Sequence, residues 1–316
     1  MMKKAENATM AKKTRRHDRK DPDEKFEVSM IGKIALFIGP FMVGILLFTI
    51  YPFINAFLMS FKENYSILKD TFSAWGLANY RKVFNDPIFL SGLKMTVKYV
   101  VIVVPISLII SIIIAVMLNS TKYFKAVLQT AYFMPLVTST AAISLVFRFI
   151  FANEGGLVNK IITSMGHAQI NFLGTNTWSE FVLYIFGIWN ILPFTIIILL
   201  AGLQNIDPQY YTAAKVDGAK TLDIFTNITV PLLSPTIALV AIVNSISAFK
   251  IFDYVFQLYN KPGPGYNLYT IIYYIYEKFG GTKPQYGYAA AASIILFFII
   301  AVFTLMQRVL QKKTDY

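Results

Sequence analysis

The sequence contains no cysteine, two histidines and few charged residues. Without cysteine the chain can form no disulfide and supply no thiolate, either as a nucleophile or as a metal ligand. His17 and His167 alone are too few for a histidine metal site, so we expect none in this chain. Charged residues make up 15% of the chain and hydrophobic residues 56%, whereas a soluble domain is about 25% charged and about 45–50% apolar. This balance excludes a disordered chain, a disulfide scaffold and a typical cytosolic enzyme.

The hydrophobic residues are gathered into long runs. A membrane-spanning helix needs about 20 predominantly apolar residues, and the stretches that meet this requirement are 34–58, 97–118, 127–151, 181–203, 232–258 and 288–306. We therefore predict an all-α membrane protein with six transmembrane helices. Its transmembrane domain would cover residues 31–310, between a polar basic tail at 1–30 and a short tail at 311–316.

Prolines lie inside most of these runs, for example Pro105, Pro193 and Pro235. In water an interior proline costs a helix about 3 kcal/mol, but in a bundle the neighbouring helices can satisfy the carbonyl that it frees. Kinked helices are typical of a protein that opens a path through the bilayer. The alternative is that proline is simply more frequent in membrane helices.

Lysine and arginine are concentrated in the N-terminal tail, between Lys12 and Lys20. A basic run can indicate nucleic-acid binding, but no nucleic-acid-binding pattern follows it, and a basic tail before an apolar run is typical of a cytoplasmic flank. With an even number of spans, both termini would then lie in the cytoplasm. The first apolar run is too long for a cleaved signal peptide, so we expect it to remain as a span.

The segment 207–231, between the fourth and fifth predicted spans, is polar and compatible with helix. It opens with Asp207 and Pro208, an N-cap residue followed by proline at the first helical position. This pattern predicts a helix over 208–216. Small side chains such as Ala213 would let a partner surface approach closely.

A break follows this helix at Asp217 and Gly218, where glycine can adopt a positive φ. We expect Asp217 to cap a second short helix over 219–227, which Pro231 would end before the fifth span. The segment thus predicts two short helices that dock into a soluble partner and transmit its motion.

This segment resembles the EAA loop of ABC importer permeases. The matching residues are Ala213, Ala214, Asp217, Gly218, Ala219, Phe225 and Pro231, and Thr212 stands where the motif has its glutamate. Other stretches after the tail resemble sugar permeases of the maltose and glycerol-3-phosphate type; they include Asn79-Tyr80, Asp86, Trp189-Asn190, Phe252-Asp253, Tyr274-Ile275-Tyr276 and Gly287-Tyr288-Ala289.

The resemblance implies a type I importer permease with a cytoplasmic coupling-helix loop between helices 4 and 5, in a bacterial cytoplasmic membrane. Such a subunit pairs with a second permease, receives a sugar from an extracytoplasmic solute-binding protein and rests on two ATP-binding subunits that use ATP and Mg. The implied contacts to those subunits come from Thr212, Ala213, Ala214, Asp217, Gly218, Ala219 and Pro231. The chain lacks the Gly-x-x-x-x-Gly-Lys-Ser/Thr loop of an ATP site, so we expect no cofactor in it.

Polar and aromatic side chains within spans four and five are candidates for the substrate route, because sugars bind through hydrogen bonds and aromatic stacking. They are Trp189, Asn190, Asn244, Ser247 and Phe252, and the aliphatic Ile251 joins them by its helical spacing. Asn244, Ser247 and Ile251 have the spacing of one helical face. The alternative is that such residues form hydrogen bonds between helices. Lys250 and Asp253 have the spacing of an ion pair.

Two other functional classes compete with an importer subunit. A stand-alone secondary carrier or channel usually needs carboxylates near the bilayer midplane, yet Asp253 is the only acidic residue inside a predicted span and lies near its end. A membrane enzyme needs an acid–base pair, a nucleophile or a metal cluster, and no pattern in the sequence indicates one.

Overall fold

The computed structural model describes residues 22–67, 69–120, 130, 134 and 136–312. The chain divides into two units, one ending at Leu58 and the other starting at Met59. Most of the tail predicted at 1–30, the end of the tail predicted at 311–316 and much of the first half of the span predicted at 127–151 lie outside the described residues.

The first unit is a single apolar helical path. α2 (Pro22–Ile45) continues through a π-helical turn, η1 (Leu46–Ile50), into α3 (Tyr51–Ser60), whose last two residues belong to the second unit. The π turn directly precedes the turn that contains Pro52, which has no N–H to offer the helix. Phe37 is 83% exposed and Phe48 is 82% exposed, as befits a membrane span that is hydrophobic all round.

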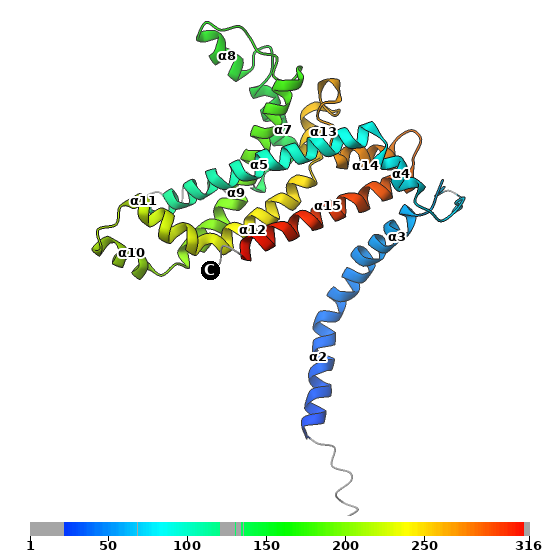
Figure 1. Ribbon diagram of the computed structural model, residues 1–316, viewed down its shortest axis with the longest axis horizontal. Helices are drawn as coiled ribbons and strands as arrows, with labels where there is room; N and C mark the ends of the chain where they lie inside the picture. The colour runs from blue at the N-terminus through cyan, green and yellow to red at the C-terminus, as the bar shows by residue number, and fades with distance from the viewer. Residues whose placement is uncertain (1–21, 68, 121–129, 131–133, 135, 313–316) are drawn as a thin grey trace, which may run out of the picture. The chain divides into compact units, whose positions relative to one another are not determined.

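The second unit is a helical bundle (Figure 1). Its long helices are α5 (Pro87–Ser120), α9 (Asn176–Gln204), α12 (Val230–Phe249) and α15 (Tyr286–Lys312). α5 packs along α9, and α12 packs against α5, α9 and α15. The shorter helices are α4 (Ala78–Phe84), α7 (Thr140–Ile150), α8 (Leu157–Ser164), α10 (Pro208–Val216), α11 (Thr221–Ile224), α13 (Asp253–Tyr259) and α14 (Ile271–Gly280).

Within the described part of the chain, five helical segments are long and apolar enough to cross a membrane, and α7 is a shorter apolar helix. The predicted spans 34–58, 181–203 and 288–306 agree with the segments Gly32–Ser60, Asn176–Gln204 and Tyr286–Gln311. The span predicted at 97–118 begins too late, because α5 starts at Pro87. The Asp86 carboxylate stabilises that start by accepting the backbone N–H of Ile88 at 2.9 Å.

The span predicted at 232–258 is wrong at both ends, because the apolar helical segment covers Thr221–Phe249. The chain then breaks before α13. At the break the buried Thr270 hydroxyl donates to the carbonyl oxygen of Ile251 at 3.0 Å, which satisfies a backbone acceptor that the helix no longer pairs. Hydropathy does not reveal this break, because α13 is also apolar and packs on α7 and α9.

The core of the bundle is aromatic where α7, α9 and α13 meet. The buried ring of Phe186 lies 4.8 Å from that of Phe147 and 5.0 Å from that of Tyr254. These contacts join three helices that are far apart in the sequence.

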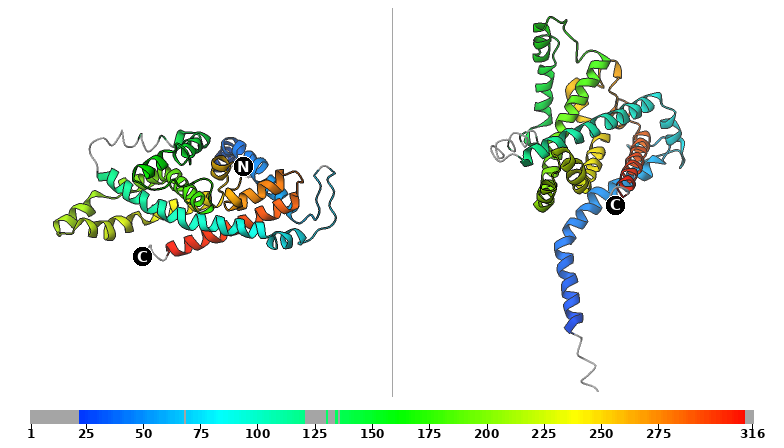
Figure 2. Two further views of the ribbon diagram at one scale, coloured as in Figure 1. Left: turned by 90° about the horizontal axis from the view of Figure 1, so that it is seen from above. Right: turned by 60° about the vertical axis from the view of Figure 1, so that its left-hand side comes forward.

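The connecting elements are sorted to the two ends of the second unit. Figures 1 and 2 show α10 and α11 at one end, with the last turns of α15 directed the same way, and α4 and α14 toward the other end. A partner on the α10 side therefore meets different residues from a partner on the α14 side.

Candidate functional site

α10 (Pro208–Val216) begins and ends where the sequence predicts. The Asp207 carboxylate accepts the backbone N–H of Gln209 at 2.9 Å. Pro208 occupies the first turn, where its missing N–H costs nothing.

Gly218 terminates α10 in the left-handed conformation, with φ of 78°. The N–H of Ala219 donates to the carbonyl of Ala214 at 2.9 Å, and the N–H of Gly218 donates to that of Lys215 at 3.2 Å. This pair of bonds is the Schellman motif, which places a residue with positive φ one position after the helix cap. The Asp-Gly-Ala string is therefore a helix stop with a backbone requirement for glycine.

Asp217 does not cap the following helix, contrary to the prediction. It is the C-cap residue of α10, and its N–H donates to the carbonyl of Ala213 at 3.0 Å. α11 starts instead after Lys220, whose N–H donates to the Asp223 carboxylate at 3.2 Å.

Pro231 does not end the second helix either. α11 continues through a π-helical turn, η2 (Phe225–Thr229), directly into α12. A π turn accommodates a nearby residue that has no N–H to donate. The segment is thus one short helix, a tight turn and the extended start of a membrane helix.

The surface of α10 and the following turn is largely exposed. Thr212, Ala213, Asp217, Gly218 and Pro231 are exposed, Ala219 is half-buried and Ala214 is buried. Large apolar side chains lie among them: Val216 is 82% exposed, Leu222 71% and Tyr210 55%. Exposed apolar groups beside small residues are typical of an interaction surface.

Thr212 satisfies its own hydroxyl within α10. The Thr212 Oγ1 donates to the carbonyl of Pro208 at 3.1 Å. The position at which the EAA motif has a glutamate is therefore neutral here and offers no charge to a partner.

The residues predicted for a substrate route in α12 are not all on one face. Asn244 is buried, and its amide nitrogen donates to the Thr195 hydroxyl of α9 at 2.9 Å, which is the interhelical contact of the alternative interpretation. Ser247 is exposed. The helical-face argument is wrong for Ile251, because α12 ends at Phe249 and Ile251 is buried in the break.

The candidates in α9 lie next to α7 and α13. Asn190 is half-buried and accepts a hydrogen bond from the Tyr254 hydroxyl at 2.6 Å. Trp189 is half-buried, with its ring 5.7 Å from that of Phe147. Phe252 lies in the break, against tyrosines of α14.

The ion pair predicted between Lys250 and Asp253 is absent from the described residues; the pairs recorded there join Lys98 to Glu180 and Lys278 to Asp86. Lys98 and Glu180 connect α5 with α9. The two residues are 82 positions apart in the sequence, so no local spacing could have indicated the pair.

Asp86 also holds α14. The Tyr274 hydroxyl donates to its carboxylate at 2.9 Å. Burial, together with this bond to a carboxylate, raises the pKa of the Tyr274 phenol well above its ordinary value, so the hydroxyl remains a donor. The structure thereby joins two of the stretches on which the family resemblance rests.

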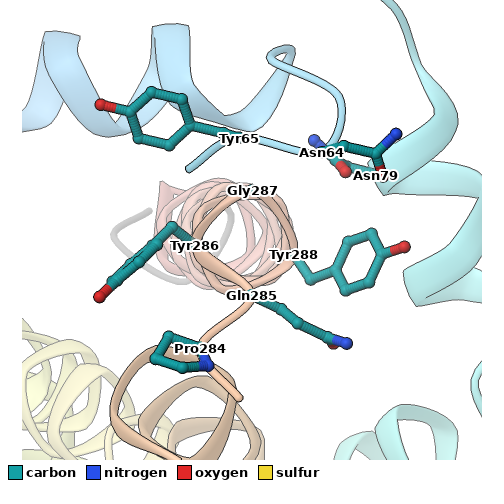
Figure 3. Close-up of a pocket in the computed structure, with 8 residues that line it drawn as sticks. All are labelled: Asn64, Tyr65, Asn79, Pro284, Gln285, Tyr286, Gly287 and Tyr288. Carbon is teal, nitrogen blue, oxygen red and sulfur yellow. The ribbon is translucent and has the colours of Figure 1, made fainter. Parts of the chain in front are cut away.

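A polar pocket of about 230 Å³ lies where α4 meets the start of α15. Its lining is uncharged: Asn64, Tyr65, Asn79, Pro284, Gln285, Tyr286, Gly287 and Tyr288. Figure 3 shows Tyr286 and Tyr288 directed to opposite sides of Gly287, with Asn64 and Asn79 facing the helix from the α4 side. A Cβ on Gly287 would lie 2.7 Å from the Asn79 amide nitrogen, so this contact between two further matching stretches requires glycine.

Solved structures of importers share this fold. A chain of a bacterial ABC transporter involved in the import of the acidic polysaccharide alginate aligns with a TM-score of 0.79 and 23% identity, over 91% of this chain and 97% of that chain. A bacterial alginate ABC transporter in complex with an alginate pentasaccharide-bound periplasmic protein gives a TM-score of 0.80 and 21% identity, over 92% and 97%. The fold is that of a type I ABC importer permease.

Sequence relatives agree with the structural class. Residues 88–316 match the family described as "Binding-protein-dependent transport system inner membrane component", and the chain belongs to this family. The arabinooligosaccharides transport system permease protein AraP of Bacillus subtilis (strain 168) is 33% identical over 273 residues, which cover 86% of each chain. The lactose transport system permease protein LacF of Rhizobium radiobacter is 31% identical, over 86% of this chain and 91% of its own. The role of the chain is therefore transport across a membrane rather than catalysis.

Proposed function

We propose that the chain is one permease subunit of an ATP-driven, binding-protein-dependent sugar importer. It forms half of the translocation pathway, and a second permease subunit forms the other half. The substrate class is supported by relatives whose names specify arabinooligosaccharides, lactose, and trehalose or maltose. An oligosaccharide of this size is the proposed cargo.

The observation that carries the proposal is the Schellman-capped α10 with its exposed surface. A helix that ends in a rigid turn and continues into a membrane helix through α11 and η2 can transmit a push from a soluble partner to the bundle. We assign Thr212, Ala213, Ala214, Asp217, Gly218, Ala219 and Pro231 to this coupling element. Two cytoplasmic ATP-binding subunits dock there and use ATP and Mg, and we expect this chain itself to bind neither ATP nor Mg.

The proposed topology places α10 and both termini in the cytoplasm. It is supported by the basic N-terminal tail and by the direction of α15 toward the α10 end (Figure 1). The opposite end, with α4, α14 and the uncharged pocket at Gly287, then faces the extracytoplasmic solute-binding protein.

Co-purification and transport test the assignment. The chain would be co-expressed with its neighbouring permease, ATPase and binding-protein genes and reconstituted in vesicles. Uptake of arabinotriose, lactose or trehalose should require Mg-ATP on the α10 side and the binding protein on the other. Uptake by this chain alone, without ATP, would instead establish a stand-alone carrier.

The coupling contact has its own test, because the chain is free of cysteine and single substitutions need no altered background. Ala213→Cys should form a cross-link to the ATPase subunit, whereas Lys160→Cys on the exposed surface of α8 should not. A membrane-impermeant maleimide added to intact cells should label Lys160→Cys and spare Lys220→Cys. Labelling of Lys220→Cys from outside would invert the topology and remove the coupling assignment.

A further inference from the structure

α14 carries aromatic residues on two faces that differ in burial. Tyr274 is 1% exposed and packs edge-on against Phe89 with ring centroids 5.4 Å apart. Tyr276 is 51% exposed, and Tyr273 is half-buried. Tyr274 therefore belongs to the core, Tyr273 packs at its edge, and Tyr276 is largely exposed.

Tyr273 and Tyr276 belong to a continuous row of five rings, which we call the aromatic row: Phe252, Phe256, Tyr269, Tyr273 and Tyr276. Phe252 lies at its centre, with its ring 4.9 Å from Tyr276, 5.7 Å from Tyr273 and 5.7 Å from Phe256. Tyr269 extends the row, 5.2 Å from Tyr273. Phe256 is 39% exposed at the other end.

Hydrogen-bonding groups border the row. The Tyr269 hydroxyl donates to the Glu277 carboxylate. Among the described residues the hydroxyls of Tyr273 and Tyr276 have no recorded partner, so they are free to bond a ligand. Flat apolar faces beside hydroxyls and a carboxylate match the two kinds of surface on a sugar ring. The exposed Glu277 carboxylate beside the row disfavours lipid chains as its occupant.

The row adjoins the predicted substrate route. Phe252 stands in the break directly after α12, and Tyr254, two residues later, bonds Asn190 of α9. The bond from Thr270 to Ile251 holds α14 to this break. α14, which carries Tyr273 and Tyr276, lies toward the end of the bundle opposite α10 (Figures 1 and 2), where sugar arrives in the proposed function.

We propose that the aromatic row is a stacking surface that receives successive rings of an oligosaccharide as it leaves the binding protein and enters the pathway. This rests on the proposed function. Tyr276 and Phe256 supply the exposed stacking positions, Phe252 and Tyr273 lie half-buried between them, and the buried Tyr269 supports the row from below. A released chain is therefore held near the entrance instead of diffusing away.

The test uses the complete reconstituted transporter with saturating binding protein loaded with arabinotriose, lactose or trehalose, whichever the wild type imports. Tyr276→Ala should lower the sugar imported per ATP hydrolysed by about 2- to 10-fold, the range that one aromatic contact supports. The ATPase rate stimulated by the binding protein should stay unchanged. Tyr276→Phe keeps the ring and should retain most of the coupling ratio.

Phe279→Ala is the matched control. Phe279 is 56% exposed on the same helix and pairs with Tyr286 outside the row, so its loss should leave the ratio unchanged. The inference would be overturned if Tyr276→Ala kept the wild-type ratio of sugar imported to ATP hydrolysed. Quenching of Tyr276→Trp fluorescence by brominated lipid would also overturn it, because the row would then face lipid. Loss of the second permease from the purified Tyr276→Ala complex would do the same, because the row would then be a subunit contact. Absence of ATP-dependent uptake by the wild type would instead contradict the proposed function itself.

Discussion

Replacement of Gly218 by alanine should uncouple transport without preventing assembly. Gly218 has φ of 78°, and a Cβ built on it meets nothing within 4 Å. The substitution therefore introduces no clash, and its whole cost is the left-handed backbone, roughly 1–2 kcal/mol for an L-residue with a side chain. That cost lowers the ratio of ordered to disordered turn by about 5- to 30-fold.

The assay is ATP-driven sugar uptake by reconstituted vesicles, with the amount of assembled complex measured in parallel. Uptake should fall by up to the same 5- to 30-fold, because this exposed turn has few other contacts that would keep it ordered. Gly218→Asn should lose less, since asparagine tolerates this conformation at helix ends.

Two glycines provide matched controls. Gly166 has φ of 82° and equally open surroundings, and Gly280 has open surroundings without a positive φ. Gly166→Ala carries the same strain away from α10 and should keep uptake per assembled complex, and Gly280→Ala should be silent. Full coupling in Gly218→Ala, or equal loss in Gly166→Ala, would refute the assignment of the Schellman turn to energy coupling.

Two further variants test the packing of the bundle. Tyr274→Phe removes a hydrogen bond to the Asp86 carboxylate, which should cost about 1.5–3 kcal/mol and lower the melting temperature of the purified complex. The control Tyr273→Phe should melt at the wild-type temperature. Equal melting temperatures of the wild type and both variants would contradict a stabilising role of the bond. Asn244→Ala removes the bond to Thr195 and should destabilise the complex by about 1 kcal/mol while uptake per folded complex is kept. A specific loss of uptake at wild-type stability would instead favour Asn244 as a lining of the substrate route.

α10 shows how far local rules reach. Its N-cap, its first-turn proline and its terminal glycine all act within a few residues, so the sequence predicts both ends correctly. The same rules failed directly afterwards, because Asp217 is a common N-cap residue, yet α11 has Lys220 at its N-cap. The Schellman hydrogen bonds to Ala214 and Lys215 decide which residue caps α11, because they hold Asp217 in the C-cap of α10.

The break between α12 and α13 shows where hydropathy stops. Residues 232–258 read as one apolar span because both helices are apolar, and the side chain that satisfies the broken backbone is Thr270, outside that run. The aromatic row also could not be predicted from local sequence. Tyr273, Tyr274 and Tyr276 are alike in sequence, and only the packing of α14 decides which of them is buried.

The apolar runs, the capped helix at 208–216 and the family resemblance are properties of neighbouring residues, and they sufficed to predict a multi-span importer permease. Tertiary structure decided the contacts between distant segments: Asp86 with Tyr274, Asn79 with Gly287, Lys98 with Glu180, and Asn244 with Thr195. The physical reason is that membrane insertion and helix capping depend on local composition and backbone geometry. The pairing of polar groups inside a bundle depends instead on which helices pack together.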